Sequence, residues 1–348
     1  MLEITTTRHN PLIDPHLAVW SWEIPVYLFL GGIVAGMMVL AGINLVRIAR
    51  GEDPRKFHSV QTPILAVALL SLGMGALFLD LSHKLYVWQI YLAFQPTSPM
   101  SWGAWILLLV YPVLIGSALW RLPESWPALA RMLPFVSRAS AWLDQRRDVL
   151  GTLGWANILV GAGLGIYTGI LLNTMVARPL WNSAILGPLF LVSGLSAGAA
   201  LIHLSTALLP GRPAPKGLIS GAFAALWQPL GSDAPPRATA SELTRADQAF
   251  LAIELVLIGL LIINLLTSSA SHSAAAGLLF SGTYALAFWG GVVGVGIIVP
   301  LALQWLELGH RIPHSVLPAL LVLAGGFALR WVMVGAGQLS HVVAVAGG

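Results

Sequence analysis

Residues 20–47 read WSWEIPVYLFLGGIVAGMMVLAGINLVR, an apolar run with one charged residue, Glu23, before its final arginine. A helix needs about 20 mostly apolar residues to cross the hydrocarbon core of a bilayer. Hydrophobic residues make up 57% of the 348-residue chain and charged residues only 9%, whereas a typical soluble domain is about 25% charged. The sequence therefore predicts an all-α integral membrane protein with eight transmembrane helices, at Trp20–Arg47, Phe57–Leu81, Ser101–Arg121, Val149–Val176, Asn182–Leu208, Arg245–Ser268, Tyr284–Leu306 and Val316–Ala336.

Basic residues occupy alternate gaps between these stretches. The gaps after the first, third, fifth and seventh stretches hold 14 of the 18 Lys and Arg residues, and the opposite side holds Arg8, Lys84 and Arg178. Because Lys and Arg are enriched in cytoplasmic loops, both termini are expected outside the cytoplasm. The pI of about 9.7 then reflects the basic residues of the loops expected in the cytoplasm. No nucleic-acid partner is expected, since no basic cluster carries interleaved aromatic residues.

The chain divides by sequence into four parts. Residues 1–19 are expected to form an outer N-terminal segment, residues 20–208 to carry spans one to five, and residues 245–348 to carry spans six to eight. Residues 209–244 are rich in proline and predict an irregular cytoplasmic linker. Packing can still group the spans as two four-helix bundles. The other long gap, residues 122–148, mixes arginines with apolar residues, which predicts an amphipathic segment on the inner membrane surface.

Cysteine is absent from the chain, which removes thiolate metal sites and iron–sulfur ligation. Of nine histidines, only His203 lies well inside a predicted span, so a facing pair of haem ligands is not expected. We therefore expect no metal site, no haem and no iron–sulfur cluster in this chain. Any metal centre for redox chemistry would belong to partner subunits.

Polar side chains from three spans are expected at one level of the membrane. Glu23 and Tyr27 lie near the outer end of span one, Asp80 near the outer end of span two, and Tyr167 in the outer third of span four. A charge within a span is costly, so these residues predict a polar pocket shared by the first four spans. Other interpretations stay open. The tyrosines can be interfacial aromatics, Asp80 can pair with Lys84 at a helix end, and Glu23 can be solvated at its helix start.

Two titratable residues, His203 and Glu254, are expected in the inner half of the membrane. They can form a proton route from the cytoplasm or simply bond neighbouring helices. Arg330 can offset the charge of Glu254. The predicted depths of these two residues differ by about 10 Å at about 1.5 Å of rise per residue, so the pair is not predicted.

The gap between spans two and three reads FQPTSPMSWGAW from Phe94 to Trp105. It resembles the Pro-Thr-Ser-Pro…Trp-Gly-Ala-Trp signature of the polysulfide-reductase membrane subunit family, the NrfD/PsrC-like proteins. Residues 178–182 (RPLWN), residues 193–198 (SGLSAG) and the opening of span one resemble the same family. The resemblance covers spans one to five by motif and the last three by hydropathy.

The resemblance implies a haem-free, eight-helix subunit of a respiratory complex in the bacterial inner (cytoplasmic) membrane. Such subunits bind quinone, either menaquinone or ubiquinone, near the outer surface among the first four helices. They exchange electrons with a ferredoxin-like four-cluster iron–sulfur subunit. That subunit connects to a molybdenum or tungsten bis-pterin catalytic subunit. The partners implied for this chain are these two subunits and membrane lipid.

The resemblance also implies roles for single residues. Tyr167 occupies the place of the family's quinone-contacting tyrosine, and Tyr27 stands about where relatives carry a polar quinone ligand. Both are expected to hydrogen-bond the head group, while Glu23 and Asp80, helped by His83, exchange its protons.

Further residues are expected around this pocket. Lys84 and Arg178 are expected to stabilise negative charge on the head group. The loop between spans two and three is expected to roof the pocket and to dock the iron–sulfur subunit through Gln95, Pro96, Ser98 and Trp102.

Two other classes of function stay open at the level of sequence. A secondary transporter of a small anion or proton fits the Gly- and Pro-interrupted spans and Glu254, but it predicts inverted repeats, which we do not find. A passive anchor would tether a peripheral enzyme to the membrane without binding quinone.

Overall fold

The structure is a computed structural model, and it describes residues 20–53, 63–208, 217–227, 236–309, 311, 313 and 315–343. Within these residues, eight helices are long and apolar enough to cross a membrane, and none of the residues forms a β-strand. The predicted all-α fold class with eight spans is confirmed. The spanning helices are α1 (Glu23–Ala49), α2 (Pro63–Asp80), α4 (Pro99–Ser125), α7 (Arg147–Asn173), α8 (Leu186–Leu208), α10 (Pro236–Thr267), the continuous pair η4 (Leu286–Ile298) and α12 (Val299–Leu308), and α13 (Leu317–Leu339).

Short helices connect the spans. The structure corrects the expectation of an irregular linker over residues 209–244, because residues 218–227 form a helix and α10 begins at Pro236. The segment 218–227 reads LISGAFAALW and contains no proline, so nothing in it interrupts a helix. The predicted segment 1–19 lies outside the described residues. The short helices are η3 (Lys84–Tyr86), α3 (Gln89–Leu92), α5 (Pro127–Met132), α6 (Pro134–Gln145), α9 (Leu218–Trp227) and α11 (Ala270–Phe280).

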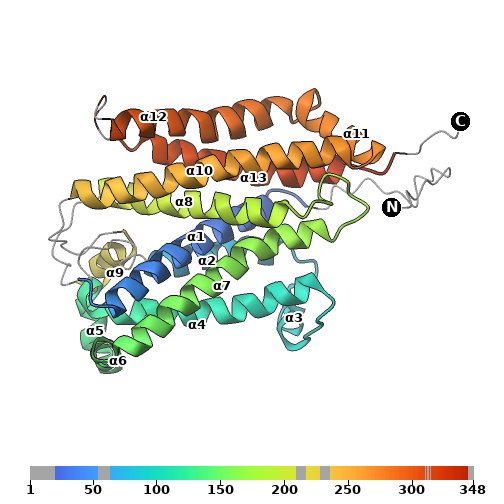
Figure 1. Ribbon diagram of the computed structural model, residues 1–348. Helices are drawn as coiled ribbons and strands as arrows, with labels where there is room; N and C mark the ends of the chain where they lie inside the picture. The colour runs from blue at the N-terminus through green and yellow to red at the C-terminus, as the bar shows by residue number, and fades with distance from the viewer. Residues whose placement is uncertain are drawn as a thin grey trace, which may run out of the picture.

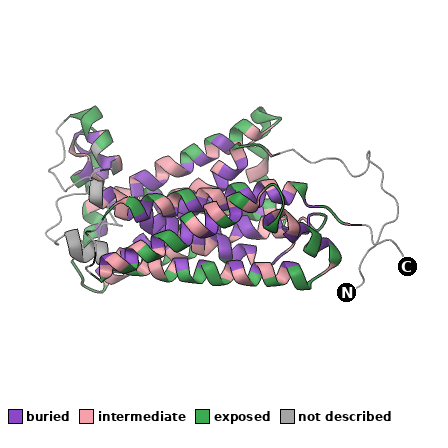
Figure 2. Ribbon diagram, turned by 90° about the horizontal axis from the view of Figure 1, so that it is seen from above, coloured by how far each residue is buried: buried purple, intermediate pink, exposed green. Residues whose placement is uncertain are grey.

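The spanning helices form two groups that lie side by side (Figure 1). Helices α1, α2, α4 and α7 pack together, and helices α8, α10, α12 and α13 form the second group. Helix α1 is central, because it packs against α2 and α7 in its own group and against α8 and α13 in the other. Helices α1, α8 and α13, which meet between the two groups, have the largest buried shares of the spanning helices. Figure 2 shows buried residues toward the middle of the molecule and exposed residues on its outer faces.

Glycines allow the two groups to approach closely. A Cβ atom at Gly36 of α1 would overlap the carbonyl oxygen of Gly194 in α8, and one at Gly198 would overlap the backbone of Gly36. The backbones of α1 and α8 are therefore in direct contact. Small residues provide such contacts in membrane proteins, where no hydrophobic effect drives helices together.

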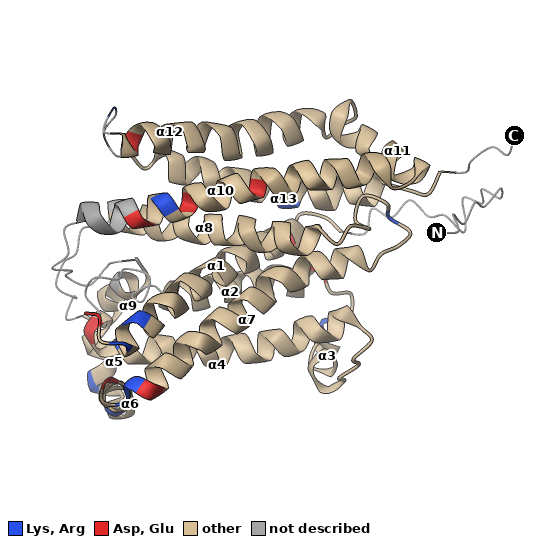
Figure 3. Cartoon of the chain, viewed as in Figure 1, with Lys and Arg blue, Asp and Glu red and all other residues tan. Residues whose placement is uncertain are grey.

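Most of the charged residues lie at one end of the molecule (Figure 3). We call the end that carries the α4–α7 connection, with α5 and α6, the basic end. Trp20 and Gln338 mark the opposite end, where the Trp20 N–H donates to Gln338 Oε1 at 2.9 Å and Gln338 Nε2 donates to the Trp20 carbonyl at 2.9 Å. The start of α1 and the end of α13 are thus joined there.

The amphipathic segment predicted within residues 122–148 forms α5 and α6. Helix α6 buries Val136 and Leu143. Ser140 Oγ donates to the Trp120 carbonyl at 2.6 Å, and Trp120 Nε1 donates to Asp144 at 2.7 Å. These contacts fix α6 across the last turns of α4 at the basic end.

Candidate functional site

A cavity of about 370 Å³ lies within the first helix group, near the end opposite the basic end. It is bounded by the first turns of α1 and α4, the last turns of α2 and α7, and the segment between α2 and α4. Most of its lining is apolar, as in small-molecule sites that hold their ligand by shape and by a few polar groups. The lining residues are Trp20, Ile24, Tyr27, Leu28, Met74, Leu77, Phe78, Asp80, Leu81, Val87, Ile90, Tyr91, Met100, Ala104, Leu107, Tyr167, Leu171 and Leu172.

Two tyrosines form the polar part of the cavity wall. Tyr27 of α1 and Tyr167 of α7 are only 5% and 7% exposed, and their hydroxyl groups hydrogen-bond each other. Both side chains border the cavity. A phenol hydroxyl is donor and acceptor, so either group can exchange its present partner for a ligand oxygen without leaving the wall.

A third tyrosine, Tyr91, lines the same cavity from the short helix α3. Burial raises the pKa of Tyr91, and the nearby phenol of Tyr111 raises it further. Tyr91 is therefore a neutral phenol at any pH below its ordinary value of about 10.

The position of Tyr167 depends on a glycine in the loop motif. A Cβ atom at Gly103 would overlap the Tyr167 ring and its hydroxyl oxygen. Gly103 lies in the first turns of α4, next to Ala104, which lines the cavity. The Trp-Gly-Ala-Trp sequence thus provides the gap that the phenol fills.

Two carboxylates lie at the mouth of the cavity. Asp80, the last residue of α2, lines it. Glu23, the first residue of α1, interacts with Asp80 through its charge and accepts a hydrogen bond from Ser21 Oγ. Glu23 is not one of the described residues that line the cavity, so it lies beside the site and not in its wall.

Three other predicted site residues lie away from the cavity wall. His83 and Lys84 are exposed in the segment after α2. Arg178 is buried, and its NH1 donates to the carbonyl oxygens of Gln338 at 3.0 Å and Ser340 at 2.8 Å. The guanidinium group therefore ties the α7–α8 connection to the end of α13.

The loop before α4 is held by its own hydrogen bonds. Trp102 Nε1 donates to the Pro96 carbonyl at 2.7 Å, and Gln95 N–H donates to Ser101 Oγ at 3.0 Å. Ser98 precedes the first residue of α4. Of the four residues predicted to dock a partner, Gln95, Pro96 and Ser98 lie in this loop and Trp102 lies in the first turn of α4, where it is 41% exposed.

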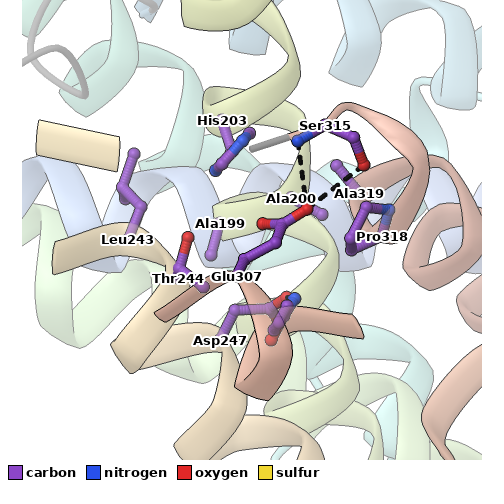
Figure 4. Close-up of a pocket in the computed structure, with 11 residues that line it drawn as sticks. Ala199, Ala200, His203, Leu243, Thr244, Asp247, Glu307, Ser315, Pro318 and Ala319 are labelled. Carbon is purple, nitrogen blue, oxygen red and sulfur yellow. Dashed lines mark hydrogen bonds between the residues drawn. The ribbon is translucent and has the colours of Figure 1, made fainter. Parts of the chain in front are cut away.

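A second set of buried polar groups lies in the other helix group (Figure 4). His203 borders a small cavity near the basic end, together with Asp247 and Glu307. Glu254 lies deeper and is 4% exposed. His203 and Glu254, the two residues predicted for a proton route, thus both belong to this larger set of buried polar groups.

The expected difference in depth between Glu254 and Arg330 is wrong. Ser193 hydrogen-bonds both side chains, and the charges of Glu254 and Arg330 interact. One cause is the start of the sixth span, because its apolar helix begins at Glu242, three residues before the predicted Arg245, which corresponds to about 4.5 Å along the helix. Glu254 therefore lies farther from the basic end than its predicted depth.

Sequence reasoning missed Tyr91 and Asp247. Val87, Ile90 and Tyr91 have the i, i+3, i+4 spacing of one helix face, which was a usable signal for residues that face the bundle. Asp247 and Glu254 are two helical turns apart, so a carboxylate near the start of span six shares a face with the deeper one.

The chain is similar to known proteins along almost its whole length. The family model described as "Polysulphide reductase, NrfD" matches residues 11–224 and 216–343. The C chain of polysulfide reductase from Wolinella succinogenes is 30% identical over 331 residues, which cover 92% of this sequence and 94% of that relative. Protein NrfD of Escherichia coli is 29% identical over 329 residues, covering 92% of this sequence and 96% of the relative. The C subunit of selenate reductase from Mesobacillus selenatarsenatis is 26% identical over 337 residues, covering 90% and 73%.

Proposed function

The chain belongs to the polysulphide reductase NrfD family, and on this basis we propose that it is the quinone-binding membrane subunit of a respiratory reductase complex. Its eight spanning helices make it a multi-pass membrane protein. Two of its relatives are named as components of a polysulfide reductase and of a selenate reductase, which supports the part of the proposal that concerns a complex.

The observation that carries the proposal is the cavity with Tyr27 and Tyr167 in its wall. Its volume of about 370 Å³ and its apolar lining fit a quinone ring with the first part of an isoprenoid tail. The two phenols are the kind of group that a carbonyl oxygen needs as a hydrogen-bond donor. A bound quinone supplies a carrier of two electrons and two protons.

We assign to each side chain a task that its position allows. Tyr27 and Tyr167 donate hydrogen bonds to the head group, which orients it. Asp80 holds or releases a proton at the cavity mouth, and the charge of Glu23 beside it tunes that exchange. His83, exposed three residues beyond Asp80, passes the proton to solution. For Lys84 and Arg178 we retain only a long-range electrostatic effect on the cavity, because neither lies in its described wall.

The orientation and partners complete the proposal. The basic end faces the cytoplasm of a bacterial inner membrane, which puts the cavity near the outer surface. A ferredoxin-like iron–sulfur subunit docks on the loop with Gln95, Pro96, Ser98 and Trp102, where Phe94 is 56% exposed. A molybdenum or tungsten catalytic subunit lies beyond it, so the metal centres belong to the partners.

The test uses the complex purified through an affinity tag on this chain. In the variant Tyr167→Phe, we expect the KM for quinol to rise by up to about tenfold, since a net hydrogen bond contributes about 0.5–1.5 kcal/mol. Tyr284→Phe is the matched control, because Tyr284 does not line the cavity within the described part of the chain.

A second readout does not depend on the partners. The isolated full-length chain is titrated with a fluorescent quinone-site inhibitor, and Tyr167→Phe is expected to weaken its binding. If the variant binds and turns over as the parent does, Tyr167 has no role at a quinone. If inhibitors fail to bind both the parent chain and the purified complex, the proposal of a quinone site is wrong.

A further inference from the structure

Ionisable side chains are buried in the second helix group, away from the large cavity. Asp247, Glu254, Glu307 and Arg330 are each 4% exposed or less. They come from three helices, α10, α12 and α13, and α8 supplies the hydroxyl groups between them. Neutral polar groups would suffice to hold these helices together, so buried charges in spans are functional candidates.

The set begins at the basic end with a small cavity of about 10 Å³, room for about one water molecule (Figure 4). Glu307, His203 and Asp247 border it. Glu307 accepts hydrogen bonds from the Ser315 N–H at 3.0 Å and from Ser315 Oγ at 3.1 Å. The set therefore begins at the basic end with the carboxylate of Glu307, which these two hydrogen bonds hold in place.

A second observation indicates that this cavity holds a ligand such as water. Gln304 is 4% exposed and borders the cavity, and its Oε1 atom has no hydrogen-bond partner among the described residues. A buried polar atom without a partner is costly unless a bound molecule satisfies it. The amide group of Gln304 is already fixed, because its Nε2 donates to Asp247 Oδ2 at 2.6 Å.

Asp247 connects the small cavity to the next turn of α8. Ser196 Oγ donates to Asp247 Oδ1 at 2.5 Å. Ser193, one turn from Ser196 on α8, hydrogen-bonds Glu254 and accepts from Arg330 NH1 at 2.5 Å. Each carboxylate thus has its own serine hydroxyl, and the two hydroxyls are one helical turn apart.

The set ends at Arg330, in contact with the central helix. Arg330 NH2 donates to the Phe190 carbonyl at 3.0 Å, and a Cβ atom at Gly32 of α1 would lie 3.0 Å from NH2. Gly32 is about one helical turn from Leu28, which lines the large cavity. The end of the set at Arg330 therefore lies about a third of the way along α1 from its first residue, short of the wall of that cavity.

We propose that Glu307, Asp247 and Glu254 form a proton half-route from the basic end to the middle of the membrane, with Glu254 as the proton-binding terminus. A hydronium ion at the basic end gives a proton to Glu307, and a water molecule in the small cavity relays a proton from Glu307 to Asp247, so that a carboxyl O–H bond breaks on Glu307 and another forms on Asp247. The proton then passes through the hydroxyls of Ser196 and Ser193 to Glu254, and each step breaks one O–H bond and forms another. No electrons move, and Arg330 keeps its charge. The inference does not require any particular occupant of the large cavity.

The first experiment is infrared difference spectroscopy of the full-length chain in nanodiscs, with pH steps and exchange into D₂O. The parent is expected to show pH-dependent, D₂O-sensitive bands of buried carboxylic acids. Glu254→Gln is expected to remove one band. Asp247→Asn is expected to slow the exchange of the Glu254 band by about tenfold or more, the scale of losing a positioned proton donor. Asp148→Asn, an exposed carboxylate in the first turn of α7, is the control and should change neither.

Specific outcomes decide the proposal. Asp247→Glu keeps a carboxyl group at the same position and is expected to restore fast exchange, which separates proton transfer from folding defects. Identical spectra for the parent and Glu254→Gln, or unaltered exchange in Asp247→Asn, would overturn the half-route. Because no quinone is added, these results are independent of the Tyr167→Phe test.

Discussion

Gly103 lies directly against the phenol of Tyr167, so that a single methyl group at position 103 would overlap the ring. This contact links the loop motif before α4 to a side chain of α7. The large cavity therefore has its shape only if both positions keep their residues. The absence of a side chain at Gly103 also explains how α4 leaves space for the ring of Tyr167 within the apolar span α7.

The substitution Gly103→Ala is expected to displace Tyr167 and to weaken binding of a quinone-site inhibitor. Overpacking of this kind costs about 1–3 kcal/mol of unfolding free energy. Thermal unfolding and inhibitor titration of the isolated chain measure both effects. Gly75→Ala in α2 is the control, because a Cβ atom there meets nothing within 4 Å. Equal inhibitor affinity in the two variants would show that Tyr167 does not form the site.

Arg178→Ala is expected to lower the stability of the chain. The variant loses two charge-assisted hydrogen bonds to the carbonyls of Gln338 and Ser340, each contributing about 1.5–3 kcal/mol. Inhibitor affinity should stay within about twofold of the parent value, because Arg178 is not among the described residues that line the cavity. A twofold ratio corresponds to less than about 0.5 kcal/mol of binding free energy. A stable variant with much weaker binding would instead support direct contact between Arg178 and the ligand.

Gly36→Ala is expected to separate α1 from α8 and to destabilise the contact between the two helix groups. The added methyl group would overlap the Gly194 carbonyl, so the expected cost is again about 1–3 kcal/mol. The control is Gly31→Ala on the same helix, where a Cβ atom meets nothing within 4 Å. The prediction fails if both variants melt at the same temperature.

Tyr91→Phe is expected to weaken quinol binding equally at every pH below about 10. Burial and the Tyr111 phenol raise the pKa of Tyr91, so the neutral phenol is present throughout that range. Its ionisation would begin only as the pH rises above the ordinary tyrosine value. KM measured across pH for the parent and the variant tests this, and a ratio that changes below that value would contradict it.

The sequence was sufficient for the spans and for the common level of Tyr27, Asp80 and Tyr167, because length and hydropathy determine where a residue lies along a membrane helix. It was insufficient for lateral contacts. Nothing in residues 178–182 indicates that Arg178 reaches the carbonyls of α13, since that depends on which helix ends are neighbours.

Glu254 and Arg330 illustrate a second limit. An error of a few residues in the start of a span moves a side chain by about 1.5 Å per residue. The helix that carries Glu254 begins before its predicted first residue. Glu254 and Arg330 then meet through Ser193. Tyr91 was missed for a different reason. Its short helix lies outside the spans, where hydropathy alone gives no depth.

Photolabelling of the full-length chain with an azido-quinone, followed by peptide mapping, tests the central claim most directly. Labels are expected on the first turns of α1 and α4, the last turns of α2 and α7, and residues 87–91, and excess unlabelled quinone should prevent them. Labels confined to α8, α10, α12 and α13, or spread over lipid-facing surfaces without competition, would contradict a quinone site at Tyr27 and Tyr167.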